Sequence, residues 1–232
     1  MLKRLLDFLA PDICPLCRDE LSLPGLGLCQ NCYNTLPQLP QRRCPACGGP
    51  ADPLLAQCHH CLKHPPRDWQ VAVAAFPFTG LARTAIHQLK YRRQRQLAVF
   101  FGQQLAQAWR QYGADDFQPD VVTPVPLHWL RRFRRGYNQA EEVARHLALQ
   151  LQLPCRTLLR RTHLTRSQAT LNAQHRARNL QNAFQALPQA QGQRILLVDD
   201  VFTTGSTLAA AAAALRRQHS KAIAVITIAR DL

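Results

Sequence analysis

An apolar run that ends in two acidic residues constrains the fold of this chain more than any other feature. The stretch ILLVDDVFTTGST, residues 195–207, passes from strand-like residues through Asp199 and Asp200 into a short hydroxyl-rich loop with one glycine. An alanine-rich segment of helical character follows the loop. This order of strand, loop and helix is the repeating unit of an open α/β sheet, which binds ligands at the carboxyl ends of its strands.

The loop has the chemistry of a phosphate site. Backbone N–H groups at a helix N-terminus favour an anion, and a glycine allows close approach to the backbone. The lysine of a Walker A loop and the spacing of a dinucleotide fingerprint are both missing. We therefore expect the loop to bind a phosphorylated sugar, whose ribose hydroxyls donate to Asp199 and Asp200. The phosphate would lie on Thr203, Thr204, Gly205, Ser206 and Thr207. The alternative is an ordinary turn beside a solvated acidic pair.

Eight of the nine cysteines form four CxxC pairs near the N-terminus. Two such pairs supply the four thiolates of a tetrahedral zinc site, and an iron–sulfur cluster is the alternative. Sequential pairing gives two consecutive zinc ribbons, and cross-bracing of the first pair with the third is the alternative that the sequence leaves open. We predict one or two structural zinc ions, with ligands Cys14, Cys17, Cys29, Cys32, Cys44, Cys47, Cys58 and Cys61. The remaining Cys155 is expected to be a small core residue.

A change in composition near residue 66 divides the chain into two expected domains. Residues 1–66 contain the cysteine pairs and many Pro and Gly residues, which predicts a double zinc-ribbon module. Residues 67–232 alternate strand and helix patterns, which predicts a parallel sheet with helices on both faces. We expect strands at 69–78, 120–126, 155–161, 194–200 and 221–229, and helices at 81–93, 96–112, 138–152 and 206–219.

The charge of the chain favours polyanionic partners. Its 232 residues include 29 Lys and Arg against 14 Asp and Glu, for a formal net charge of +15. Nucleic acid, an anionic membrane surface or a phosphate-rich small molecule would each suit this excess. Asp7 interrupts the apolar run at the N-terminus, and no stretch approaches the length of a membrane span. We therefore expect a cytoplasmic protein with no transmembrane segment.

Aromatic residues lie among the basic clusters at 90–95 and 131–135. Bases of single-stranded DNA stack on such rings while arginines contact phosphates, so single-stranded DNA is an expected partner. The alternative is that the aromatic side chains belong to the core and the arginines serve a diphosphate. Lys90 is assigned to a basic stripe with Arg92, Arg93 and Arg95 rather than to the cleft.

Residues 195–207 resemble the phosphoribosyl-pyrophosphate (PRPP) motif of type I phosphoribosyltransferases. Three further features extend the resemblance to the ComF family of competence proteins and related GntX-type DNA-utilisation proteins. They are the cysteine-rich N-terminus, TPVPLHWLRRFRRGYNQAEEVA at 123–144 and RRTHLTRSQATLNAQHRARNLQNAF at 160–184. Trp129 departs from the family pattern, in which many members have a proline after PVPLH.

The resemblance implies an α/β fold, in which a parallel-sheet type I phosphoribosyltransferase-like domain is preceded by a small cysteine-rich zinc-ribbon module. It implies PRPP binding with Mg²⁺ at the acidic pair and loop. Pyrophosphate would contact Arg131, Arg132, Arg134 and Arg135. A mobile flap would carry Arg161, Thr165, Gln168 and Arg176.

Three functions remain open from the sequence. The chain could be a PRPP-dependent transferase whose catalytic residues and acceptor the sequence does not identify. It could be a non-catalytic, zinc-stabilised protein that binds single-stranded DNA. It could also be a zinc-stabilised scaffold for a helicase or another DNA-uptake protein.

Overall fold

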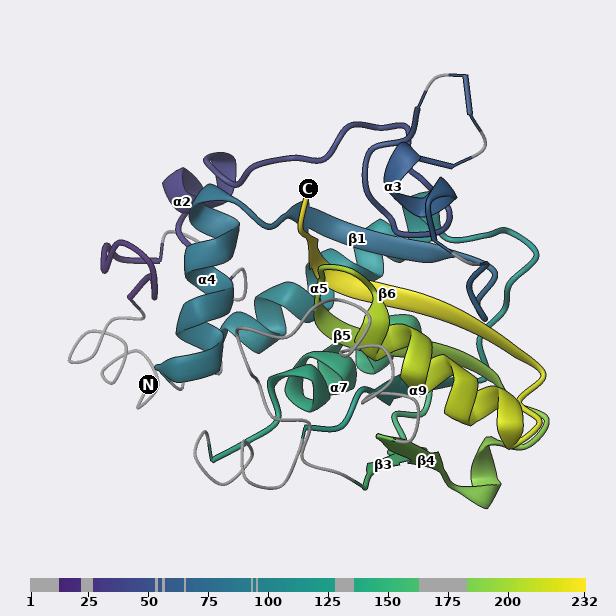
Figure 1. Cartoon of the computed structure of the whole chain (residues 1–232). Coiled ribbons are helices and arrows are strands. Elements are labelled where there is room, and N and C mark those ends of the chain that lie inside the picture. Colours follow the sequence, from purple (N-terminus) through teal and green to yellow (C-terminus); the bar gives the residue numbers. More distant parts are fainter. Residues whose placement is uncertain are drawn as a thin grey trace.

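A parallel β-sheet forms the centre of the structure, a computed structural model that describes residues 13–21, 27–52, 54–55, 57–64, 66–92, 94, 96–127, 136–162 and 183–232. Within these residues four strands pair in the order β1-β6-β5-β2 (Figure 1). All the neighbouring pairs are parallel, as the alternating sequence pattern predicts. The strands are β1 Ala72–Pro77, β2 Val121–Pro124, β5 Arg194–Phe202 and β6 Ala222–Arg230.

Helices cover both faces of the sheet, which confirms the predicted α/β class (Figure 1). Side chains alternate along a strand, so Leu196 and Val198 of β5 face one core while Ile195 and Leu197 face the other. The first core is closed by α4 Gly80–Tyr91, α5 Gln96–Tyr112 and α7 Gln139–Leu151, and the second by α9 Ser206–Arg217. No helix in the described part of the chain is long and apolar enough to cross a membrane.

The segment 155–161 does not form the predicted strand of the main sheet. Cys155 makes one isolated parallel bridge to Val122, and the chain then leaves the sheet. It forms β3 (Leu159–Arg161), which pairs antiparallel with β4 (Phe184–Ala186) in a separate two-stranded sheet followed by the short 3-10 helix η1 (Pro188–Ala190). This departure places the buried Leu159 in the same core as α9.

The first zinc ribbon packs against α5. Its helix α2 (Gln30–Asn34) places Tyr33 edge-on to Phe100, with the ring centroids 6.2 Å apart. Leu28 and Leu36 are buried in the same core as Phe100. The ribbon therefore shares a core with the face of the sheet that α5 covers.

The second zinc ribbon lies against the outer edge of β1. It contains the short helix α3 (His59–Leu62). Gly48 forms a parallel bridge to Val73, and the N–H of Ala72 donates to the carbonyl of Pro45 at 2.7 Å. A Cβ atom at Gly48 would lie 2.6 Å from the backbone N of Ala74, so this contact requires a glycine.

Candidate functional site

The eight paired cysteines form two separate tetrads, in the sequential pairing. The ligand atoms of each tetrad all lie within 4.8 Å of one another. Tetrahedral zinc with Zn–S bonds of about 2.3 Å places its sulfurs slightly less than about 4 Å apart, so both tetrads fit the ion. The first tetrad is Cys14, Cys17, Cys29 and Cys32, and the second is Cys44, Cys47, Cys58 and Cys61. The cross-braced alternative is therefore excluded.

Hydrogen bonds within the second tetrad favour the thiolate form of Cys44. The thiol of Cys47, helped by the N–H groups of Cys58 and Ala46, lowers the pKa of Cys44 to about 4. Burial raises the pKa of Cys61 to about 12. These hydrogen bonds favour the thiolate form of Cys44, and all four thiols of the tetrad lose their protons when a metal ion binds.

The predicted phosphate loop lies at the N-terminus of α9. Gly205 caps this helix with φ +77°, in the left-handed region that favours glycine. A Cβ atom there would lie 2.6 Å from the Phe202 ring, so both backbone conformation and space select glycine. The hydroxyls of Thr204 and Ser206 are 2.8 Å apart, and the N–H of Ser206 donates to the Thr204 hydroxyl at 3.3 Å.

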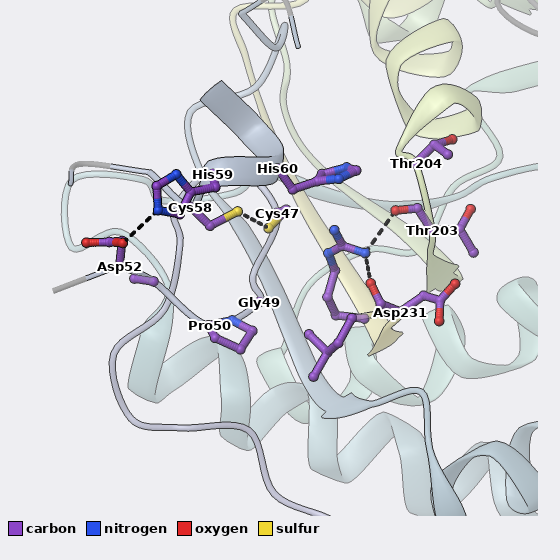
Figure 2. Close-up of a pocket in the computed structure, with 13 residues that line it drawn as sticks. Cys47, Gly49, Pro50, Asp52, Cys58, His59, His60, Thr203, Thr204 and Asp231 are labelled. Atoms are coloured by element: carbon purple, nitrogen blue, oxygen red, sulfur yellow. Dashed lines mark hydrogen bonds and ion pairs between the residues drawn. The ribbon is translucent and has the colours of Figure 1, made fainter. Parts of the chain in front are cut away.

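Two arginines donate hydrogen bonds to the carbonyl groups of residues 202–204, and dashed lines in Figure 2 mark the contacts to Thr203 and Asp231. Arg230 donates to the carbonyls of Phe202 at 3.1 Å and Thr203 at 2.9 Å, and its side chain also reaches the carbonyl of Asp231. Arg67 donates to the carbonyl of Thr204 at 3.1 Å. The C=O and N–H of one trans peptide point in opposite directions. The N–H groups that follow these carbonyls are therefore directed away from the arginines.

The second zinc ribbon supports both arginines. The guanidinium of Arg67 lies 5.5 Å from the ring centroid of Trp69, whose indole N–H donates to the carbonyl of Ala46 at 3.0 Å. Arg230 is buried beside Gly49, where an added Cβ would lie 3.1 Å from its Cγ atom. The sequence did not indicate either arginine, because neither belongs to the loop motif.

The two acids at the end of β5 have different surroundings. Asp200 forms an ion pair with Lys90 Nζ at 2.9 Å and accepts a hydrogen bond from Gln139 Nε2 at 2.6 Å. Burial and the neighbouring carboxylate of Asp200 raise the pKa of Asp199 to about 7. The assignment of Lys90 to a basic stripe with Arg92, Arg93 and Arg95 is therefore wrong, since its side chain is 16% exposed and pairs with Asp200.

Several predicted contacts lie outside the described residues. They are Arg131, Arg132, Arg134 and Arg135 of the pyrophosphate loop, and Thr165, Gln168 and Arg176 of the expected flap. Arg161 is described and belongs to β3, with its guanidinium 5.2 Å from the centroid of the Phe184 ring. Its charge also lowers the pKa of Asp199 to a small extent, against the larger effect of burial.

Comparison with known proteins identifies both parts of the chain. The phosphoribosyl transferase domain family matches residues 104–232, and the double zinc ribbon domain family matches residues 5–62. DNA utilization protein YhgH of Salmonella typhi is 36% identical over 227 residues, covering 96% of this chain and 98% of its own. The protein of the same name from Escherichia coli K12 is 35% identical with the same coverage. Competence protein F of Haemophilus influenzae is 32% identical, covering 94% of this chain and 96% of its own.

Proposed function

This chain belongs to the family of DNA utilization and competence F proteins, in which a double zinc ribbon precedes a phosphoribosyl transferase domain, and we propose that it binds PRPP. We place the boundary between its two domains near residue 66. The names of its relatives support a role in DNA uptake or in the use of DNA as a nutrient. Paired thiols in metal-ligand clusters suit a reducing compartment, so we place the protein in the cytoplasm.

The hydrogen bonding of the loop at 203–207 carries this proposal. Arg67 and Arg230 hold its carbonyl groups, which leaves its amide groups and the N-terminus of α9 for a terminal phosphate. Asp199 and Asp200 lie at the carboxyl end of β5, where they accept hydrogen bonds from ribose hydroxyls. Lys90 and Gln139 fix the position of the Asp200 carboxylate.

We propose that the diphosphate of PRPP contacts the segment that follows β2 in the sequence and lies outside the described residues. This segment contains Arg131, Arg132, Arg134 and Arg135, whose guanidinium groups suit a diphosphate. The carboxylates of Asp199 and Asp200 are the oxygen ligands that Mg²⁺ prefers. When bound, Mg²⁺ supplies positive charge to the departing pyrophosphate. We propose on these grounds that the chain is a phosphoribosyltransferase.

Isothermal titration of the full-length protein with PRPP, with and without Mg²⁺, tests the proposal. Asp200→Asn removes the negative charge that pairs with Lys90 and that strengthens the hydrogen bonds accepted from ribose, so PRPP affinity should fall by about tenfold or more. Asp116→Asn, at an exposed position away from the sheet edge, is the matched control. The proposal fails if the parent protein does not bind PRPP, or if Asp200→Asn binds it equally well.

One further observation favours single-stranded DNA as a second ligand. The ring centroids of Phe78 and His87 are 6.3 Å apart, and those of His87 and Tyr91 are 5.8 Å apart. The guanidinium of Arg83 lies 5.7 Å from the centroid of Phe78, and Tyr91 is 63% exposed. Such a surface offers rings to bases and cations to phosphates. A helicase or another DNA-uptake protein would be the corresponding partner.

A further inference from the structure

A small cavity lies between the first zinc ribbon, the segment that joins the two ribbons, and the C-terminal half of α5. Its volume is about 120 Å³, and neither the acidic pair nor the loop at 203–207 lines it. Its lining includes Tyr33 of α2, Leu39 and Arg43 of the joining segment, Phe76 of β1 and Tyr112 of α5. The cavity therefore lies where the zinc ribbons meet the sheet domain, apart from the site already described.

The lining of this cavity is polar and carries a single charge. Gln104, Gln107 and Gln111 are spaced three and four residues apart, so they share one side of α5, and Gln38 joins them from the opposite wall. Arg43 is the one charged residue among the described residues that line the cavity. A cation and several amides without a carboxylate disfavour a metal ion or an amine and favour an anion.

The guanidinium of Arg43 is held in place by the protein itself. It lies over the ring of Tyr112, 4.4 Å from the ring centroid, and its Nη2 atom donates to the carbonyl of Leu39 at 3.3 Å. The N–H bonds of a guanidinium lie in its plane, so a ring against its face leaves its edges available to a ligand. The orientation of this cation is thus set before any ligand binds, which lowers the cost of binding.

Two nitrogens of Arg43 lack acceptors. Its Nε and Nη1 atoms are buried, and neither has a hydrogen-bond partner within the part of the chain that the structure describes. These two nitrogens carry three N–H groups. A buried charged donor without an acceptor costs more than a neutral one, and a negatively charged oxygen would satisfy it.

We propose that this cavity binds a small tetrahedral oxyanion of the phosphate or sulfate type, with Arg43 as its principal ligand. The oxygens of a tetrahedral anion point in several directions, toward the Arg43 edges and toward the glutamine amides of α5, whereas those of a carboxylate lie in one plane. A water molecule occupies about 30 Å³ in the liquid, so the cavity has room for about four waters. This space suits inorganic phosphate, with its five non-hydrogen atoms, and is too small for a nucleotide or for PRPP. The proposal does not depend on PRPP binding.

A bound oxyanion would connect parts of the chain that are distant in sequence. Arg43 directly precedes the first ligand of the second zinc tetrad, whereas the glutamines belong to α5, about sixty residues later. Because the cavity exists only in the folded chain, a ligand there stabilises the fold by mass action. The anion would therefore strengthen the attachment of the joining segment to α5.

NMR of the arginine Nε–H groups tests the site directly, on the zinc-loaded full chain at neutral pH. The Arg43 signal is the one that disappears in Arg43→Gln, or in Arg43→Lys if the first variant does not fold. Sodium phosphate at constant ionic strength should shift this signal to saturation, and sodium chloride should not shift it. Acetate should bind at least about fivefold more weakly, because it has one negative charge and two oxygens.

A matched pair of charge variants tests the location. Gln107 is exposed on α5, and Gln107→Glu places a carboxylate at the cavity that pairs with Arg43 and repels an anion. Phosphate affinity, measured from the shift of the Arg43 signal, should fall by about tenfold or more. Gln150→Glu makes the same change at an exposed residue of α7 that does not line the cavity, so affinity should stay within about twofold of the parent.

Each result decides for or against the cavity. An Arg43 signal that phosphate does not move would show that water alone satisfies this arginine, and the proposal would be wrong. Phosphate that binds only at the loop at 203–207 gives this same unmoved signal, so the two sites are distinguished. An equal shift with chloride, or unchanged phosphate affinity in Gln107→Glu, also overturns the site, and acetate binding as tightly as phosphate overturns the tetrahedral class.

Discussion

At the scale of single residues, Gly205 is required for two separable reasons. Its φ of +77° disfavours any side chain, and a Cβ atom would also meet the ring of Phe202 at 2.6 Å. Gly192 has φ +71° but nothing within 4 Å of its Cβ position, so substitution at Gly192 measures the cost of the backbone conformation alone. Gly192→Ala should cost about 1 kcal/mol of unfolding free energy, and Gly205→Ala should cost more and also weaken PRPP binding. Urea unfolding and PRPP titration of both variants provide the measurements. An equal loss of unfolding free energy in the two variants would show that contact with the Phe202 ring contributes nothing.

The carboxyl of Asp199 should make the stability of the fold depend on pH. Burial raises its pKa to about 7, whereas in the unfolded chain an aspartate has a pKa of about 3.9. Between these values the folded state holds a proton that the unfolded state has lost, so stability falls as pH rises toward 7. Above pH 7 the carboxyl is ionised in both the folded and the unfolded state, and the decrease in folding stability is complete.

Asp199→Asn removes this penalty and keeps an oxygen that can accept from the N–H of Asp200. The melting temperature of the variant should equal that of the parent near pH 4 and exceed it by at least about 3 °C at pH 8. Thermal unfolding across this range, without PRPP or Mg²⁺, is the measurement. A difference that does not change with pH would show that Asp199 is not the titrating group.

At the scale of elements, the second zinc ribbon and the loop at 203–207 form one connected unit. Arg67 and Arg230 connect them, and the first ribbon packs instead on α5. Loss of zinc from the second tetrad should therefore release the loop, whereas loss from the first should not. Cys44 and Cys14 are both fully buried ligands, so Cys44→Ser and Cys14→Ser form a matched pair.

We expect Cys44→Ser to weaken PRPP binding by about tenfold or more, because loss of the groups that orient the binding residues has an effect of this size at other sites. Cys14→Ser should bind PRPP within about twofold of the parent. Zinc content by mass spectrometry and PRPP titration on the same samples provide the measurements. Equal weakening by both substitutions would contradict the coupling and indicate a general loss of stability.

The elements around the site could be predicted from the sequence because their signals are local. The apolar run before Asp199, the glycine at 205 and the CxxC spacings each depend on neighbouring residues. Lys90 and Arg67 could not be placed, because distant elements bring them to the site: Arg67 bonds the loop from 137 residues away. β4 was missed because a three-residue strand gives no measurable periodicity.

At the scale of the whole molecule, the excess of positive charge predicts DNA binding that depends on salt. Exposed Arg83, His87, Tyr91 and Arg92 lie along α4 and its C-terminal end. Replacing Arg83 and Arg92 together with Gln should shallow the slope of log affinity against log salt by about 1–2, as fewer counterions are released. Fluorescence anisotropy with a labelled single-stranded oligonucleotide across a salt series measures this slope.

Arg160→Gln with Arg217→Gln removes the same charge from exposed positions elsewhere and serves as the control. The surface formed by Arg83, His87, Tyr91 and Arg92 is the DNA-binding surface only if this control keeps the steeper salt slope of the parent protein. If both double variants behave alike, the net charge rather than this surface governs binding, and absence of binding at low salt would remove single-stranded DNA as a ligand.

The contact between Gly48 and Val73 also has a bearing on how the protein behaves when metal is scarce. β1 is an outer strand, and on its free side the second ribbon accepts the N–H of Ala72 at the carbonyl of Pro45 and forms a β-bridge between Gly48 and Val73. An uncovered strand of this kind is a template for pairing with another chain. Chains made without zinc would therefore tend to adhere to one another, so metal starvation would appear in the cell as loss of recoverable protein rather than as an otherwise intact protein that lacks an accessory part.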